Sequence, residues 1–196
     1  MKYGFEKEYW VVKGGTHLAL VPDGIPKDEC GYLAEARGDP HTDPELSAAL
    51  FRVAETRLYG LVLKLEGLYS LDSSNATMRP NKQLLYDALR LHGKPTYPQG
   101  RGNIYGLDYK PSNRDTRAAL HVHFSDQYED KNGAKHCRMI DMPKYIQALD
   151  TAFAKQIKDA RRLPGFYEMK PHGFEYRSLP CNVDPFDVAK VLLEIK

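Results

Sequence analysis

Several short segments of this chain place two chemically capable side chains two residues apart, the spacing that puts both on one face of a β-strand. The pairs are Glu6 and Glu8, Glu35 and Arg37, His121 and His123, and Glu175 and Arg177. Apolar residues alternate with them, as Leu120, Val122 and Phe124 do around the histidines. If one sheet gathers these faces, it presents carboxylates, imidazoles and guanidiniums to a common site.

Carboxylates gathered in this way raise one another's pKa unless cations lie among them. A divalent ion meets that need, and glutamate oxygens with few imidazoles and no thiolate favour Mg²⁺ or Mn²⁺ over zinc. Mg²⁺ commonly accompanies phosphate, which the arginines and Lys170 would bind. Two alternatives stand beside this interpretation: a zinc hydrolase built on the histidines, and an amphipathic sheet whose polar face simply meets water.

The elements that must position these residues are predicted from periodicity and turn signals. Residues 3–11 alternate as a strand, whose apolar face carries Tyr3, Phe5, Tyr9 and Val11. Gly14 and Gly15 predict a turn, followed by a return strand over 17–21 and a short strand over 31–37.

Helices are predicted where apolar residues recur at helical spacing, three of them behind a capping aspartate and a proline. Their ranges are 44–65 after Asp43, 81–92, 141–157 from Asp141, and the residues that follow Asp184. The segment 94–117 between them has no sustained periodicity and carries an excess of basic residues, among them Arg101 and Arg117. We expect it to be a long basic loop that closes over a substrate, with an ordinary solvated loop as the alternative.

Composition limits the class of protein. The 196 residues predict one domain spanning 1–196, and 42% hydrophobic with 28% charged residues exclude a disordered chain. A formal net charge of +2 is too small for binding nucleic acid or an acidic membrane by bulk charge. Three widely spaced cysteines without a CxxC pair argue against a disulfide scaffold and fit a reducing compartment. With no apolar run of transmembrane length and no signal peptide, a cytoplasmic protein is expected.

Four motifs, in this order, carry a resemblance to a known family. GFEKEYW, YLAEARGDP, ALHVHFS and KPHGFEYRSLP resemble motifs of the carboxylate-amine ligases in the glutamine synthetase and glutamate-cysteine ligase superfamily. The closest group is the small phage-type amidoligases called COOH-NH2 ligase type 2, for which the location would be the host cytoplasm. The resemblance spans Gly4 to Pro180. It implies an α+β domain whose curved antiparallel sheet forms a funnel-like active site, with helices packed on the outside.

The resemblance also implies a role for individual residues. The metal ligands would be Glu6, Glu8, Glu35, His121 and Glu175, with His123 at the nucleotide, although the motif does not separate the two histidines. The segment around Glu35 differs from the commoner EIRTP form of the family. The cations that would bind ATP phosphates and serve catalysis are Lys170, Arg177, and Arg161 or Arg162.

The implied activity is ATP- and Mg²⁺-dependent (or Mn²⁺-dependent) amide formation through an acyl phosphate. Positioning and electrostatics suffice for such a reaction, which agrees with the lack of a nucleophile motif. The expected partners are a small-molecule or peptide carboxylate and an amine, with nucleic acid only as a modified-base substrate, no membrane, and an oligomer left open. The alternatives are a metal-dependent hydrolase or phosphotransferase using the same residues, and a non-catalytic protein that binds nucleotide or nucleic acid.

Overall fold

An antiparallel sheet of eight strands forms the centre of the computed structural model, which describes residues 1–28, 31–74, 77–78, 100–107 and 116–195. The strands run in the order β2-β1-β8-β12-β11-β6, and β3 and β4 also pair with β1. Their bounds are Thr16–His17 (β2), Lys2–Lys13 (β1), Ala119–Ser125 (β8), Gly173–Pro180 (β12), Phe166–Lys170 (β11), Arg101–Asn103 (β6), Ala34–Arg37 (β3) and Tyr69–Asp72 (β4).

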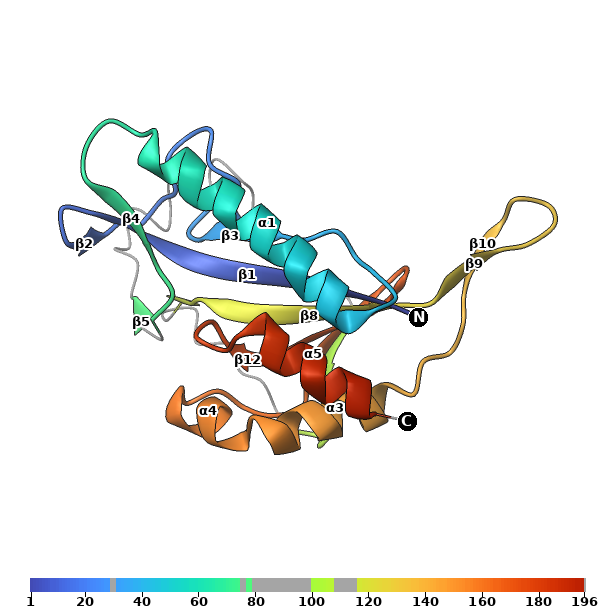
Figure 1. Cartoon of the computed structure of the whole chain (residues 1–196). Coiled ribbons are helices and arrows are strands. Elements are labelled where there is room, and N and C mark those ends of the chain that lie inside the picture. The colour runs from blue at the N-terminus through green and yellow to red at the C-terminus, as the bar shows by residue number, and fades with distance from the viewer. Residues whose placement is uncertain (29–30, 75–76, 79–99, 108–115, 196) are drawn as a thin grey trace.

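Four helices lie together on one face of this sheet (Figure 1). They are α1 (Pro44–Leu63), α3 (Met142–Ala152), α4 (Ala154–Asp159) and α5 (Pro185–Glu194). The strand face beneath them supplies the predicted apolar residues of β1, which belong to the main hydrophobic core together with Leu120, Val122 and Phe124 of β8. The α+β class with an antiparallel sheet is therefore confirmed.

The helices begin where the capping signals predict. Asp43 accepts hydrogen bonds from the backbone N–H groups of Glu45 (2.8 Å) and Leu46 (3.3 Å), and Asp184 accepts one from Phe186 (2.8 Å). A proline follows each of these aspartates and fits the first helical turn because it has no N–H to satisfy. The helix expected over 81–92 lies outside the described residues.

The helix predicted over 141–157 is instead two helices that meet at Phe153. Phe153 leaves helical geometry, with φ −109° and ψ 19°, and its side chain is buried in the core. Just before it, the Thr151 hydroxyl donates to the Gln147 carbonyl at 2.7 Å, a side-chain bond that commonly bends helices. Apolar spacing continues across the break and therefore conceals it.

Three predicted non-helical segments also differ in detail. The return strand is only Thr16–His17, and the strand expected over 31–37 is only Ala34–Arg37. The segment 94–117 is not wholly a loop, because Arg101–Asn103 forms the edge strand β6 and Thr116–Arg117 forms β7, which pairs with β5 (Thr77–Met78). Residues 94–99 and 108–115 lie outside the described part of the chain.

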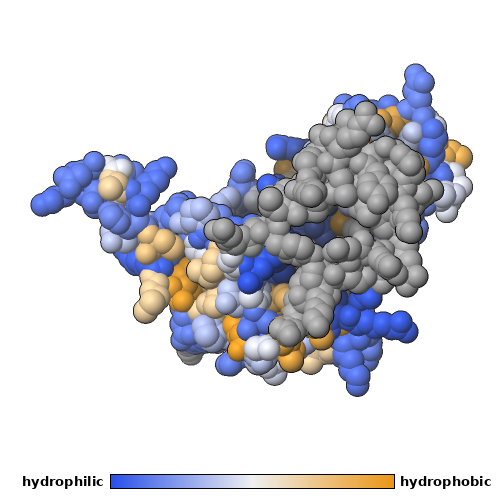
Figure 2. Space-filling model, turned by 180° about the vertical axis from the view of Figure 1, so that it is seen from behind, coloured by the Kyte–Doolittle hydropathy of each residue, from blue (hydrophilic) through white to orange (hydrophobic). Residues whose placement is uncertain are grey.

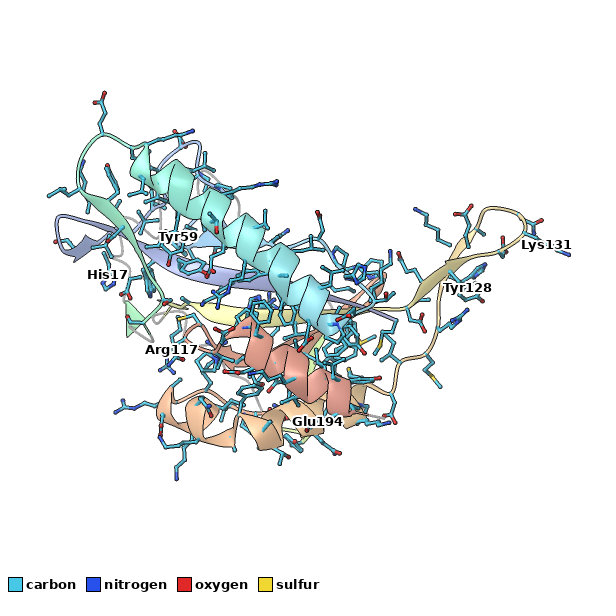
Figure 3. All side chains as sticks on the ribbon, viewed as in Figure 1. His17, Tyr59, Arg117, Tyr128, Lys131 and Glu194 are labelled. Carbon is cyan, nitrogen blue, oxygen red and sulfur yellow. The ribbon has the colours of Figure 1, made fainter. Side chains whose placement is uncertain are left out.

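A two-stranded ribbon, β9 (Gln127–Glu129) and β10 (Lys135–Cys137), projects from the sheet next to the end of β8. Figure 3 shows Tyr128 and Lys131 on this ribbon, away from the helices. The ring of Tyr128 stacks on His136, with centroids 5.3 Å apart, and Cζ of Arg138 lies over the Tyr128 ring, 5.2 Å from its centroid. These local contacts stabilise a ribbon to which no third strand of the described residues pairs.

Stability of the sheet is expected to depend strongly on Phe124, which is fully buried and stacks on Phe174 of β12 with centroids 4.4 Å apart. Phe124→Ala removes this contact and leaves a cavity, so we expect the free energy of unfolding to fall by about 3–5 kcal/mol. Urea denaturation measures this loss. Val53→Ala, at an exposed position of α1, is the control, and equal midpoints for both variants would contradict the assignment of the core.

Candidate metal centre on the polar face of the sheet

The register of the strands explains why the paired residues share one face. Glu6 of β1 lies opposite Arg37 of β3 on one side and His121 of β8 on the other. Glu175 of β12 lies opposite His123. Directly paired residues of antiparallel strands point to the same face, and this one is turned away from the helices. In the view of that side, hydrophilic side chains lie near its middle (Figure 2).

Two buried carboxylates and one imidazole form the centre of the site. The Nδ1 atom of His121 lies 3.2 Å from Oε1 of Glu6 and 3.0 Å from Oε1 of Glu175. The other oxygen of Glu6 lies 3.2 Å from Nε2 of His123 and 2.9 Å from Nε of Arg37. His121 thus connects the carboxylates of Glu6 and Glu175. Glu6, on β1, in turn contacts side chains of both neighbouring strands, β3 and β8.

The pKa values reflect this mutual stabilisation of charge. Burial acts to raise the pKa of Glu6, but hydrogen bonds from His121 and His123 outweigh it and lower the pKa well below its usual range. Burial and the charge of Arg177 act to lower the pKa of His121, but Glu8 and Glu175 outweigh them and raise it to about 9. Burial and the nearby charge of Glu6 raise the pKa of Glu35 to about 8. Protons on His121 and Glu35 therefore balance part of the negative charge at neutral pH.

Glu6, His123 and Glu175 form a group that could hold a metal ion. One ligand atom from each of the three residues lies within 4.8 Å of the others. Two carboxylate oxygens and one imidazole nitrogen suit a hard divalent ion such as Mg²⁺ or Mn²⁺. Of the two histidines, this geometry favours His123 as the ligand, because Nδ1 of the buried His121 is occupied by both carboxylates and orients them.

The affinity of this group for a divalent ion is expected to rise with pH. A cation bound there repels the proton on His121 and lowers the pKa of Glu35, so it displaces protons below pH 8. Each displaced proton weakens binding by up to about tenfold per pH unit below the pKa. Calorimetric titration of Mn²⁺ at pH 6, 7 and 8 measures this dependence. Glu35→Gln should make it shallower, and an affinity that does not change with pH would contradict the charge balance described above.

Glu8 and Glu35, two further predicted ligands, lie directly opposite each other on β1 and β3, and both are buried. Arg37 forms an ion pair with Glu35. Glu8 has no hydrogen bond or ion pair among the described residues. Sequence reasoning missed a third carboxyl beside them: burial and the charge of Glu8 raise the pKa of Asp28 to about 7. The metal-ligand roles of Glu8 and Glu35 stay predictions.

The predicted cations Lys170 and Arg177 border the same centre. Nζ of Lys170 lies 3.0 Å from Oε2 of Glu175, and Nη1 of Arg177 contacts Oε1 of the same carboxylate. Both also contact Glu168 of β11, which is buried opposite Glu175 in the register and which sequence reasoning missed. The signal was present, because Glu168 and Lys170 repeat the two-residue spacing of the other pairs.

Arg162, a further predicted cation, donates to the backbone beside Arg177. The pairing of β12 with β8 shifts between Tyr176 and Leu179, which leaves Arg177 and Ser178 in an irregular stretch. The Arg162 guanidinium donates to the carbonyls of Arg177 (2.9 Å), Ser178 (3.1 Å) and Ala118 (3.3 Å). This places Arg162 on the backbone around Arg177, where these three hydrogen bonds support the irregular stretch of the strand.

Arg161 is not brought to the centre. It is exposed after α4, in a turn where its φ is +52°, and its carbonyl accepts a hydrogen bond from Arg117 at 2.8 Å. Arg117 thus ties β7 to this turn. Arg101, expected in a loop over the site, lies instead in the edge strand β6, where Nε donates to Glu168 at 2.8 Å.

His172, in the turn between β11 and β12, is a neighbour that sequence reasoning also missed. Its ring centroid lies 6.1 Å from that of His123. Burial, with the charges of His123 and Lys170, lowers the pKa of His172. The KPHG segment that holds it was noticed only as part of a motif.

Comparison of this chain with protein-family models, with curated proteins and with solved structures finds no match. Among the described residues, no helix combines the length and the apolar composition that crossing a membrane requires.

Proposed function

We propose that this protein is an ATP- and Mg²⁺-dependent ligase that joins a carboxylate to an amine. The observation that carries the proposal is the shared carboxylate Glu175, which belongs to the Glu6–His123–Glu175 group and also contacts Lys170 and Arg177. A site for a metal-bound polyphosphate needs a carboxylate-rich part for the ion and a cationic part for the phosphates. The order of the four sequence motifs favours the same activity.

Each residue of the site has a task in this reaction. Glu6, His123 and Glu175 would hold the divalent ion, which would neutralise the negative charge of the phosphates. Lys170 and Arg177 would bind the oxygens of the transferred phosphoryl group. His121 fixes the two carboxylates and so keeps the site in place before any substrate binds.

The chemistry needs no nucleophile from the protein. A carboxylate does not react with an amine at neutral pH, because oxide is too poor a leaving group. Transfer of the terminal phosphoryl group of ATP to the carboxylate gives an acyl phosphate and ADP. The amine then attacks the acyl carbon, phosphate leaves, and the amine nitrogen loses a proton as the amide forms.

The proposal includes the finer architecture, in which the curved sheet forms the wall of a funnel-like site. The arrangement of the helices supports it, because the four helices of the described residues lie on the opposite face of the sheet. The substrates would be a small-molecule or peptide carboxylate and an amine. A zinc hydrolase is less well supported, because the group that could hold a metal ion combines one imidazole, that of His123, with two carboxylates.

The test is ADP release measured across pairs of carboxylates and amines, with Mg²⁺ or Mn²⁺ present. The proposal expects release that requires both partners of a pair. ADP or phosphate released at the same rate without an amine would indicate a hydrolase or a phosphotransferase and would contradict the proposal. Glu129→Gln on the β9–β10 ribbon is the control variant and should behave as wild type.

A further inference from the structure

A buried carboxylate, Glu168, gathers three cations from three neighbouring strands. Its Oε2 atom lies 2.8 Å from Nε of Arg101 in β6 and 3.3 Å from Nη1 of Arg177 in β12. Its other oxygen contacts Nζ of Lys170 in β11. Only 3% of Glu168 is exposed, whereas the cations around it remain partly exposed. The carboxylate is thus the buried base of a cationic group at one side of the proposed metal centre.

The cations keep hydrogen-bond donors that Glu168 does not occupy. Arg101 is bound through Nε alone, so both of its terminal nitrogens have no partner among the described residues. Arg177 uses only Nη1 for Glu168 and Glu175, which leaves Nε and Nη2. Lys170 contacts two carboxylates and has a third N–H.

The group formed by these three cations and the carboxylates they contact has a net positive charge. Three permanent cations face two carboxylates, Glu168 and Glu175, and hydrogen bonds from Lys170 and Arg101 outweigh burial to keep the pKa of Glu168 low. On the opposite side of the site, toward β3, the guanidinium of Arg37 contacts the carboxyl groups of Glu6 and Glu35. The excess of permanent cations therefore lies on the side of the face toward β6.

We infer that Arg101, Lys170 and Arg177 form a binding site for a phosphate group at the end of a polyphosphate, and that Glu168 positions these three cations. The site adds Arg101 and Glu168 to the phosphate-binding residues discussed above. A terminal phosphate has three oxygens that point in different directions, and donors converging from three strands match them. The identification of the polyphosphate as ATP rests on the proposed function; the phosphate site itself does not.

Calorimetric titration of inorganic triphosphate, with a chelator present to remove divalent ions, tests the site on the whole chain. We expect wild type to bind triphosphate and Arg101→Ala to bind it about tenfold more weakly. Arg138→Ala is the matched control, since it removes the same charge from an exposed position near the β9–β10 ribbon. Equal weakening by both substitutions would mean unspecific attraction and would overturn the inference. Equally tight binding of tricarballylate, a tricarboxylate, would overturn it in favour of a carboxylate site.

The role of Glu168 is tested by whether Glu168→Gln raises or lowers the affinity for triphosphate. Glu168→Gln makes the site more positive by one charge, so attraction alone would make triphosphate bind more tightly. If Glu168 positions the cations, the amide holds them less well and triphosphate binds more weakly, which is the result we expect. Tighter binding would refute the positioning role. If the variant does not fold, Arg101→Ala and Arg101→Lys still decide the site, because Lys lacks the two terminal nitrogens and should not restore affinity.

The same titrations separate this inference from the proposed function. Triphosphate binding that depends on Arg101, combined with no ADP release for any carboxylate and amine, would sustain the phosphate site and contradict the ligase. ADP release that requires both substrates, combined with triphosphate binding unaffected by Arg101→Ala, would sustain the ligase and contradict the phosphate site.

Discussion

Replacing Glu175 with glutamine is expected to abolish ATP turnover that depends on a divalent ion. Glu175 is 1% exposed and contacts His121, Lys170 and Arg177, so the neutral amide removes a proposed metal ligand and the counter-charge of three side chains at once. The charge and the hydrogen bond of His121, together with the charge of Arg177, outweigh burial and lower the pKa of Glu175 well below its usual range, so the carboxylate stays ionised. No other described group contacts all three partners.

The loss should be visible before any substrate is known. We expect Mn²⁺ affinity to fall by at least about 100-fold, and the free energy of unfolding to fall by about 3 kcal/mol because the buried His121 loses a charged partner. Calorimetry and urea denaturation measure the two quantities. Glu129→Gln, the same substitution on the β9–β10 ribbon, should change neither. Wild-type Mn²⁺ affinity in folded Glu175→Gln would show that the ion does not bind at this carboxylate.

Replacing His123 is expected to affect mainly metal affinity, whereas replacing His121 is expected to affect stability as well. The side chain of His123 is 23% exposed and contacts Glu6, whereas that of His121 is 2% exposed and contacts both buried carboxylates. His123→Ala should therefore lower Mn²⁺ affinity with little loss of stability. His121→Ala should lower the free energy of unfolding by about 3 kcal/mol, since it leaves two buried carboxylates without their shared partner.

Thermal unfolding and Mn²⁺ titration of both variants measure this difference. Removing His121 should also weaken Mn²⁺ by about 10- to 100-fold, because the carboxylates lose their fixed orientation. His136→Ala, on the exposed ribbon, serves as the control for loss of an imidazole. A destabilised His123→Ala beside a stable His121→Ala would reverse the assigned roles.

The sequence was most informative where a pattern of two residues coincided with strand pairing. The pairs on β1, β3, β8 and β12 lie on one face of the sheet because the strand register places these residues directly opposite one another, and opposite residues point to the same face. Capping aspartates followed by proline likewise located the starts of α1 and α5, because this signal is local. Both kinds of prediction require only neighbours along the chain.

Features that depend on distant parts of the chain could not be predicted. Arg162 reaches the backbone of two strands, and nothing in DARRLPG indicates that these carbonyls need a donor. Arg101 lies in a strand because its segment pairs with β11, although the sequence of that segment does not alternate between apolar and polar residues. Which of His121 and His123 contacts both buried carboxylates likewise depends on the three-dimensional arrangement of the strands. Each of these features follows from contacts between distant segments and not from residue type.

The central claim is that one polar face binds a divalent ion and the phosphates of ATP together. The most direct measurement is calorimetric titration of a non-hydrolysable ATP analogue into wild type and Glu175→Gln, each with Mg²⁺ and with a chelator. The account predicts binding to wild type that strengthens with Mg²⁺ and loses this Mg²⁺ dependence in Glu175→Gln. Binding with equal affinity in all four titrations, or no binding to wild type with Mg²⁺, would contradict it.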